Sequence, residues 1–399
     1  MIEYEEALKQ ILKNSSPLPP EKISIEDSIG RILKEDVYST IEMPPFDKAA
    51  MDGYAIRARD VENAPTNLRC IGLIQAGDIF KNKLNRAECV KIMTGAPLPQ
   101  GAQSVVMVED TLQSGDSVLI KKTVKKGENV CFRGEDLKRR QRVLEQGVKI
   151  SPAHVAVLAT VGRRFVRVAA KPQVAILNTG GEIVPAGSKL GKNKIYNSNG
   201  PMLEALLKSD NIEPSFLGIA KDDPGELRSA IKQGLKKNVL LVSGGVSMGD
   251  YDLVPEVLAS LGVRKIFHKV NIKPGKPLFF GVKNKTLVFG IPGNPVSNFL
   301  SYLVFVRPAL CNLMGYQYCE PEFREGLAAK KIITKTGRRH FVPVKIIKNK
   351  NQYHLTPVNS HGSADIMALS EADGFMVVDK ERTAVEKNSK MKFITWKII

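Results

Sequence analysis

The feature that most constrains this chain is a run of four apolar residues, 239–242, that passes directly into the sequence Ser-Gly-Gly at 243–245. An apolar run bounded by glycines is typical of a strand buried on both faces of a parallel sheet. Glycines at the end of such a strand let backbone N–H groups approach a ligand closely. Two carboxylates, Asp250 and Asp252, follow soon after. The stretch predicts a site for a phosphorylated, metal-bound ligand, and a glycine-rich surface turn is the alternative interpretation.

Strand-like and helix-like segments alternate along residues 174–293. The expected strands are 174–177, 216–220, 239–242, 264–270 and 286–289. This alternation predicts an open, mostly parallel sheet with helices on both faces. Polar loops follow four of the strands: NTGGE (178–182), the loop 243–252, IKPGKP (272–277) and GIPGNP (290–295). We expect these loops to meet at the carboxyl edge of the sheet, where such folds bind ligands.

The residue types in these loops suit phosphate and a hard cation. Phosphate groups are expected on the glycine-rich backbone and on helix N-termini, with Lys273 and Lys276 as point charges. Glu182, Asp250 and Asp252 are oxygen ligands of the kind that Mg²⁺ prefers. The chain has neither a P-loop nor a G-x-G-x-x-G motif, which argues against ordinary nucleotide hydrolysis and NAD chemistry.

The flanking sequence predicts further domains. Helices are expected at 3–13, 24–32 and 151–161, and the last of these is a candidate to join the N-terminal helices in one discontinuous domain. Residues 54–131 have the texture of a small β domain. Residues 320–399 are β-like again and predict a small barrel or sandwich, in which Arg338, Arg339 and Ser363 are candidates to reach an anion and surface positions are the alternative.

The charge and cysteine content narrow the class of protein. The 399 residues carry a net charge of +18, yet no aromatic residues interleave with the basic stretches and no helix-turn-helix or zinc-finger pattern occurs. We therefore expect no nucleic-acid partner, and most of the charge is interpreted as a solvated lysine-rich surface. Five widely spaced cysteines predict free thiols and a cytoplasmic location. No signal peptide and no membrane span are expected.

Eight motifs between residues 44 and 297 together resemble the molybdopterin molybdenumtransferase family, which inserts molybdenum into molybdopterin. In chain order they are PPFDKAAMDGYA, IMTGAPLPQGA, RGED, NTGGEI, SNGPML, SGGVSMGDYD, IKPGKP and GIPGNPVS. The resemblance implies four domains. These are an elongated helical domain (1–43 with 137–171), a β domain (44–136), an α/β molybdopterin-binding domain (172–318) and a C-terminal β-barrel (319–399).

The resemblance also implies a reaction and an assembly. The substrates are adenylylated molybdopterin and molybdate, and AMP is released with Mg²⁺ as cofactor. The assembly is a homodimer whose cleft joins the α/β domain of one subunit to the β domain of the other. A contact with molybdopterin adenylyltransferase is a further expected partnership.

The resemblance assigns roles to individual residues. The implied catalytic residues are Asp52, Thr94, Asp136, Glu182 and Asp252. It implies that Lys273 and Lys276 hold phosphate or molybdate and that Pro292 and Pro295 shape the loop beside the pterin. Together with these four, the expected substrate-binding residues are Gly244, Gly245, Ser247 and Ser363. The metal ligands are expected among Glu182, Asp250 and Asp252.

Four alternatives stay open at this point. The family usually has an aromatic residue where this chain has Leu253, so Asp250 is an alternative to Asp252 in its role, and tungstate is an alternative to molybdate. Molybdopterin adenylyltransferase resembles the α/β domain alone, but it usually has Gly-Gly-Thr-Gly where this chain has Gly-Gly-Val-Ser at 244–247. A non-catalytic scaffold of the gephyrin type is the alternative from a different class, and the retained acidic positions argue against it.

Overall fold

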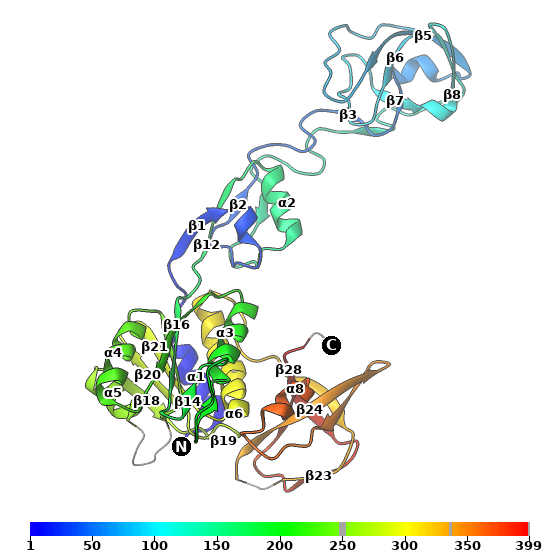
Figure 1. The fold of residues 1–399 in the computed structure, drawn as a ribbon. Coiled ribbons are helices and arrows are strands. Elements are labelled where there is room, and N and C mark those ends of the chain that lie inside the picture. The colour runs from blue at the N-terminus through cyan, green and yellow to red at the C-terminus, as the bar shows by residue number, and fades with distance from the viewer. Residues whose placement is uncertain (247–252, 335–336, 398–399) are drawn as a thin grey trace. The chain divides into compact units, whose positions relative to one another are not determined.

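The computed structural model describes residues 1–246, 253–334 and 337–397, and it divides the chain into two compact units (Figure 1). One unit comprises Met1–Lys22 and Arg167–Ile399, and the other comprises Ile23–Val166. Strands β1 (Pro20–Ser24) and β12 (Phe165–Ala169) pair where the chain passes from one unit into the other. Each unit has its own hydrophobic core and is described by itself.

A six-stranded sheet forms the centre of the first unit, in the order β16-β13-β17-β21-β20-β18. Its strands are β13 (Val174–Thr179), β16 (Pro214–Ala220), β17 (Val239–Ser243), β18 (Arg264–His268), β20 (Phe279–Lys283) and β21 (Thr286–Ile291). The first four strands of the order run parallel, which confirms the expected mostly parallel sheet. Strand β20 was not expected, and it runs antiparallel to both of its neighbours. Because β20 reverses the direction, β18 runs parallel to β21 again, and its carboxyl end lies at the same edge as the others.

Alternate residues of the central strands face two separate cores. Val174 and Ile176 of β13 belong to one core, and Ala175 and Leu177 belong to the other. Strands β13, β17 and β21 are buried along their whole length, as expected for parallel strands with helices on both faces. The first core is completed by α1 (Tyr4–Asn14), α3 (Asn199–Ser209), α6 (Pro295–Ser301) and α7 (Arg307–Leu313). The second is completed by α4 (Pro224–Gly234) and α5 (Val254–Ser260).

The long helix expected at 296–313 contains a wider turn. Helices α6 and α7 are joined by a π-helical segment, η4 (Tyr302–Val306), in which every residue is buried. Pro308 follows this segment, and a proline inside a helix removes a hydrogen bond and crowds the preceding turn. The segment Pro295–Leu313 is long and apolar enough to cross a membrane, but 83% of its most apolar window is buried inside the protein. Its environment is that of a core helix.

The C-terminal part of the first unit is a closed five-stranded β-barrel, as expected. The barrel closes because β24 pairs with β25 and β26, and β22 and β28 complete the ring between them. The strands are β22 (Arg324–Ala328), β24 (Arg339–Asn349), β25 (Gln352–Pro357), β26 (Gly374–Val378) and β28 (Lys390–Thr395). Strand β19 (Ile272–Lys273), from the α/β domain, adds to the edge of β24. The short pair β23 (Ile332–Ile333) and β27 (Ala384–Val385) lies outside the ring.

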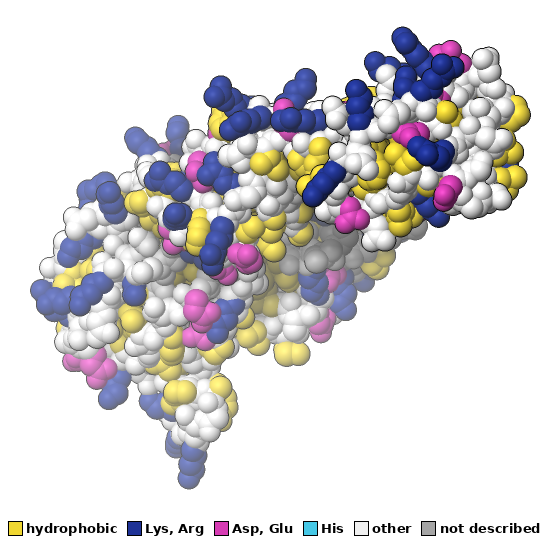
Figure 2. Space-filling view, turned by 90° about the horizontal axis from the view of Figure 1, so that it is seen from above, with side chains coloured by type: hydrophobic (Ala, Val, Ile, Leu, Met, Phe, Trp, Pro, Cys, Tyr) yellow, Lys and Arg dark blue, Asp and Glu magenta, His cyan; other side chains and the backbone are white. Residues whose placement is uncertain are grey.

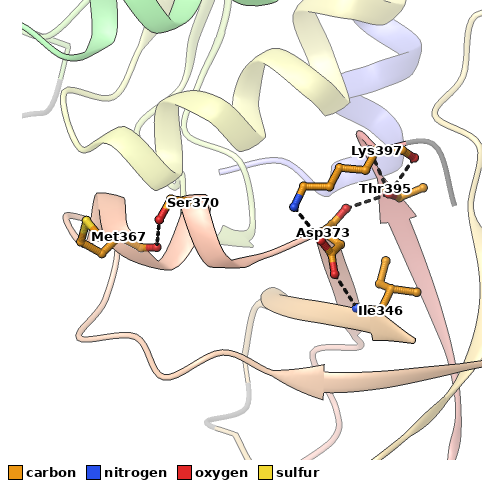
Figure 3. A network of polar contacts seen from close by, with 6 residues as sticks. All are labelled: Ile346, Met367, Ser370, Asp373, Thr395 and Lys397. Atoms are coloured by element: carbon orange, nitrogen blue, oxygen red, sulfur yellow. Dashed lines mark hydrogen bonds and ion pairs between the residues drawn. The ribbon is translucent and has the colours of Figure 1, made fainter. Parts of the chain in front are cut away.

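Asp373 joins three strands of the barrel (Figure 3). Its carboxylate accepts hydrogen bonds from Lys397 Nζ (2.6 Å) and from the Ile346 N–H (2.8 Å). Its backbone carbonyl accepts a hydrogen bond from the Thr395 hydroxyl (2.7 Å). Helix α8 (Ile366–Glu371) ends just before Asp373 and leads into β26 of the barrel.

The second unit contains the expected β domain. Its sheet has the order β7-β4-β6-β5-β9-β8. The strands are β4 (Gly53–Ile56), β5 (Thr66–Ile74), β6 (Glu88–Ile92), β7 (Ser104–Met107), β8 (Thr111–Ser114) and β9 (Ser117–Ile120). Two cores lie on its two faces, since Ala55 belongs to one of them and Tyr54 and Ile56 to the other. The 3-10 helices η2 (Ala58–Val61) and η3 (Val108–Asp110) connect strands of this domain.

The remainder of the second unit has little helix. Helix α2 (Pro152–Thr160) begins at the N-cap Ser151, as the sequence predicts, and it is the only α-helix of residues 23–166, all of which the structure describes. The expected helix at 24–32 is wrong, because only a 3-10 turn, η1 (Glu26–Ser28), forms there. Two small strand pairs complete the unit: β2 (Val37–Tyr38) with β11 (Arg142–Leu144), and β3 (Lys48–Ala49) with β10 (Val130–Cys131). Helix α1 packs in the first unit.

Figure 2 shows the side-chain types on one face of the protein. Lysine and arginine side chains are scattered across the face shown in Figure 2, and aspartate and glutamate side chains lie among them.

Candidate active site

A cleft of about 880 Å³ lies at the carboxyl edge of the α/β sheet. The loops that follow β13, β16, β17 and β21 all contribute to it, so the predicted convergence of strand-end loops is observed. Its lining residues are Thr179, Gly180, Glu182, Ile183, Ile195, Tyr196, Asn197, Ser198, Asn199, Asp222, Ser243, Gly244, Gly245, Val246, Pro277, Pro292, Gly293, Asn294, Pro295, Ala364 and Ile366. Five of the predicted site residues, namely Glu182, Gly244, Gly245, Pro292 and Pro295, are therefore brought together here.

The floor of the cleft requires glycine. Gly244 has a φ of +95°, and a Cβ at this position would lie 2.5 Å from the backbone oxygen of Thr179. Gly245 has a φ of +62°, and a Cβ there would lie 2.8 Å from the Val254 side chain. Both positions combine a left-handed backbone with close neighbours, which only glycine accepts without strain. The two glycines therefore let the end of β17 lie close to Thr179 of β13 and to Val254 of α5.

Buried amide side chains fix the loops around this floor. The Asn199 amide group donates to the Gly293 carbonyl (2.6 Å) and to the Ser243 hydroxyl (3.2 Å). The Asn298 amide group donates to the same hydroxyl (2.8 Å) and to the Pro292 carbonyl (3.1 Å). The ends of β17, β21 and helix α3 are thus held by one hydrogen-bonded cluster, which keeps the shape of the cleft rigid.

Several buried polar atoms beside this cluster have no hydrogen-bond partner among the described residues. They are both amide atoms of Asn178, the Thr179 hydroxyl, and the Oδ1 atoms of Asn199 and Asn298. Buried polar groups are normally paired with protein or ordered water, and a group of unpaired ones is unusual. Their position next to the cleft indicates that this end of the sheet is built to bind something polar.

Two carboxylates line the cleft. Glu182 follows β13, and its carboxylate lies close to Gly180. One carboxylate oxygen is 2.8 Å from the position that a Cβ on Gly180 would occupy. Asp222 follows β16, and its carboxylate accepts a hydrogen bond from the Gly181 N–H (3.2 Å). Among the described residues, no three His, Cys, Asp or Glu side chains form a metal-binding group. The predicted residues Ser247, Asp250 and Asp252 lie outside the described residues.

Ser363 and the IKPGKP loop lie where the barrel meets the α/β domain. The Ser363 hydroxyl accepts a hydrogen bond from the Asn294 amide group (2.8 Å), beside the cleft. Lys273 pairs with His340 in the β19–β24 ladder, and Lys276 is exposed. Neither lysine is among the residues that line the cleft, although Pro277 of the same loop is.

A positive region surrounds His340 near this loop. Arg338 donates to the Ile272 carbonyl (3.5 Å). Burial, followed by the charges of Lys273 and Arg338, lowers the pKa of His340 to about 4. The imidazole is therefore neutral at pH 7, and the positive charge of this region comes from the lysine and the arginine.

The three predicted residues of the second unit occupy loops of the β domain. The Thr94 hydroxyl and N–H both donate to one carboxylate oxygen of Asp52, at 2.6 and 2.7 Å. These two hydrogen bonds hold the pKa of Asp52 below its ordinary value, and the bond from the hydroxyl has the larger effect. Asp136 lies exposed in a turn. The Asp136 N–H donates to the Met43 carbonyl (3.0 Å), and this bond holds the turn in place.

Some lining residues were not predicted as site residues. Asp222 reads in the sequence as part of a helix start, since Asp223-Pro224 follows it, and Asp223 is indeed the N-cap of α4. Tyr196 and Asn199 lie in or beside motifs that were singled out only for their glycines, prolines or capping residues. The signal that could have found Asp222 is its position directly after a parallel strand.

The fold and the cleft define a multidomain protein built around an α/β domain of the molybdopterin-binding type. Three family models match the chain: the MoeA N-terminal region (domain I and II) over residues 2–162, the probable molybdopterin binding domain over 175–312, and the MoeA C-terminal region (domain IV) over 325–396. The chain belongs to the MoeA family of molybdopterin molybdenumtransferases, which are transferases of molybdenum cofactor biosynthesis.

Individual relatives support this assignment along the whole chain. The molybdopterin molybdenumtransferase of Staphylococcus epidermidis is 32% identical over 382 residues, which cover 94% of this chain and 91% of the relative. That of Staphylococcus aureus is 32% identical over 377 residues, covering 93% and 90%. The crystal structure of a molybdopterin biosynthesis MoeA protein from Pyrococcus horikoshii superposes with a TM-score of 0.87 at 31% identity, and all of both chains is covered.

Proposed function

We propose that this chain inserts molybdenum from molybdate into adenylylated molybdopterin and releases AMP. The observation that supports the proposal best is the cleft at the carboxyl edge, which combines bare glycine backbone, two carboxylates and a fixed polar floor. In the reaction, water adds to one phosphorus of the pyrophosphate link and the bridging oxygen leaves with the other, which gives AMP and molybdopterin. The two dithiolene thiols of the pterin then form bonds to the molybdenum, and their protons leave with one molybdate oxygen as water.

Each group of residues has a proposed task. The Gly245 N–H binds a phosphate oxygen, whereas the Gly244 N–H already donates to the Ile291 carbonyl (3.0 Å). Pro292 and Pro295 shape the wall beside the pterin. Lys273 and Lys276, with Ser363, hold phosphate or molybdate through charge and hydrogen bonds.

Mg²⁺ fits the donor set of the cleft. This ion is usually bound through one or two carboxylates together with substrate phosphates. Glu182 and Asp222 are the described side chains that would hold it, and Asp250 and Asp252 remain predicted ligands. When bound, the ion offsets phosphate charge and polarises the bond that is cut.

Asp52, Thr94 and Asp136 are proposed to complete the site from the β domain of a second copy. This requires a homodimer, which is the assembly that the family resemblance implies. The further proposals are a cytoplasmic location, a contact with molybdopterin adenylyltransferase, and no nucleic-acid or membrane partner.

The direct test incubates the purified protein with adenylylated molybdopterin, Mg²⁺ and either molybdate or tungstate. AMP release and metal retained on the pterin are measured together. Both signals with molybdate support the proposal, and the tungstate arm shows which metal is preferred. Tight binding of the substrate without AMP release would contradict the proposal and favour the scaffold of the gephyrin type.

Variants of the two cleft carboxylates test their proposed role. Glu182→Gln and Asp222→Asn remove negative charge while keeping side-chain size, so both are expected to raise the Mg²⁺ concentration needed for half-maximal AMP release by about tenfold or more. Glu213→Gln is the matched control, because Glu213 is exposed and pairs only with Lys208 among the ion pairs of the described residues. An unchanged Mg²⁺ requirement in both cleft variants would exclude these two residues as ligands.

A further inference from the structure

The segment that follows the NTGGE motif brings an aromatic ring to the cleft. Strands β14 (Ile183–Val184) and β15 (Ile195–Tyr196) pair in parallel, and the Ile195 N–H donates to the Glu182 carbonyl (3.0 Å). The Tyr196 hydroxyl donates to the Ser188 carbonyl (3.0 Å), which fixes the ring from its polar end. The residue remains 45% exposed even though it lines the cleft.

Tyr196 is the only aromatic residue among the described residues that line this cleft. Apolar residues line the cleft on two sides of the glycine floor. Ile183 and Ile195 accompany it after β13, whereas Pro292 and Pro295 follow β21. Because β17 lies between β13 and β21 in the sheet, these two apolar groups flank the floor formed by the end of β17.

This arrangement separates two kinds of binding surface within one cleft. The floor offers the glycine turn and amide side chains, which suit phosphate and other polar groups. The flanks offer a partly exposed ring and the flat faces of proline, which suit a planar aromatic group. An anchored ring of this kind loses little conformational freedom when a ligand packs against it, because its hydroxyl is already bound.

We propose that Tyr196 stacks on an aromatic heterocycle of the substrate and helps to determine the specificity of the cleft. The proposal rests on the proposed function, which supplies a substrate with two such heterocycles, the pterin and the adenine. Both offer the same chemistry, a planar ring with a π face, to a tyrosine side chain. Stacking of a base on an aromatic residue typically contributes about 1–3 kcal/mol, which corresponds to about 5- to 150-fold in affinity.

The test measures equilibrium binding of two probes to the full-length chain. AMP carries only the adenine ring, and molybdopterin without the adenylyl group carries only the pterin. Tyr196→Leu keeps apolar bulk but removes the π face, and Tyr196→Phe keeps the ring but removes the bond to Ser188. The expected result is about 5- to 150-fold weaker binding of one probe by Tyr196→Leu, with a much smaller effect of Tyr196→Phe. Tyr318→Leu, at a position that is 84% exposed and outside the cleft, is the control.

The outcomes distinguish adenine from pterin as the stacked ring, and they distinguish failure of the stacking proposal from failure of the proposed function. Weaker binding of AMP assigns the contact to adenine, and weaker binding of molybdopterin assigns it to the pterin. Unchanged binding of both probes in a folded Tyr196→Leu variant overturns the stacking proposal, as does an equal loss in Tyr196→Phe or in the control. If Tyr196→Leu releases AMP with an unchanged KM, stacking fails while the proposed function stands. If the wild-type chain binds the probes through Tyr196 but releases no AMP, the proposed function fails while stacking stands.

Discussion

Single residues set the charge of the candidate site before any substrate arrives. Asp52 receives both the hydroxyl and the N–H of Thr94, and these bonds favour the ionised carboxylate. Because folding lowers the pKa of Asp52, these bonds stabilise the folded state fully at pH values above the pKa of Asp52 in the unfolded chain. That stabilisation is lost as the pH falls through the lower, folded-state pKa. Asp52 is thus negatively charged and fixed in orientation at neutral pH.

The first prediction concerns this pair. Thr94→Val removes the hydroxyl, which is the larger of the two contributions, so the pKa of Asp52 is expected to rise towards its ordinary value. Thr94→Ser keeps the hydroxyl and is expected to leave the pKa low. Carboxyl chemical shifts followed by NMR over a pH titration measure both values. Identical titration curves for Thr94→Val and the wild type would show that the hydroxyl does not bond to Asp52 in solution.

The second prediction concerns Gly244. Gly244→Ala adds a Cβ 2.5 Å from the Thr179 carbonyl in a left-handed backbone, and it is expected to lower the free energy of unfolding by about 2–4 kcal/mol. Gly262→Ala is the matched control, because Gly262 has a φ of +77° but no atom within 4 Å of the added Cβ. It is expected to cost about 1–2 kcal/mol, the strain of the backbone alone. Urea unfolding measures both, and an equal loss would show that the close approach to Thr179 is relaxed without cost.

Contacts that the sequence does not reveal join helices at the opposite edge of the sheet, where β16 begins. Asp210 ends helix α3 and accepts hydrogen bonds from the Tyr302 hydroxyl (2.7 Å) and from Arg307 Nε (2.8 Å). Tyr302 begins the π-helical segment, and Arg307 begins α7. One carboxylate thereby joins helix α3, which carries Asn199 into the cleft, to the helix that follows the GIPGNP loop.

The third prediction is for this junction. Tyr302→Phe removes a hydrogen bond to a charged acceptor from a fully buried ring, and the expected loss in the free energy of unfolding is about 1.5–3 kcal/mol. Tyr318→Phe, on an exposed ring, is the control and is expected to change stability by less than about 0.5 kcal/mol. Chemical denaturation monitored by circular dichroism gives both values. A loss no larger than that of the control would indicate that water replaces the lost bond without cost.

The elements around the site differ in how far the sequence predicts them. The strand 239–243 and its glycine turn are predictable, because a continuous apolar run and Ser-Gly-Gly have few other structural explanations. Strand β20 is not, since its five residues lie between Pro277 and a turn at Asn284 and show no distinctive periodicity. Asp222 is hard to recognise as a site residue from the sequence, because its neighbour Asp223 has the same side chain and is the helix cap. The bond between Asp52 and Thr94 joins residues far apart in the chain, and only tertiary structure brings them together.

The whole molecule consists of two compact units, and the amino-acid composition does not reveal this division. Residues 23–166 form a continuous insertion with cores of their own, whereas the first unit is assembled from Met1–Lys22 and Arg167–Ile399. The motifs attributed to the family are shared between the units, with Asp52 and Thr94 in one and the glycine-rich cleft in the other. Each unit therefore has its own hydrophobic cores and its own share of the predicted site residues.

The last prediction follows from this division. Ile92 lies in a core of the second unit and Ile176 in a core of the first, and both are fully buried. Each isoleucine-to-alanine substitution is expected to cost about 2–5 kcal/mol, since it leaves a cavity where a well-packed side chain had been. If the units unfold independently, Ile92→Ala lowers the midpoint of one thermal transition and Ile176→Ala lowers that of the other, as differential scanning calorimetry would record. A single transition that both variants shift equally would show that the two units unfold as one cooperative structure, and that a defect in either core is transmitted to the site residues of both.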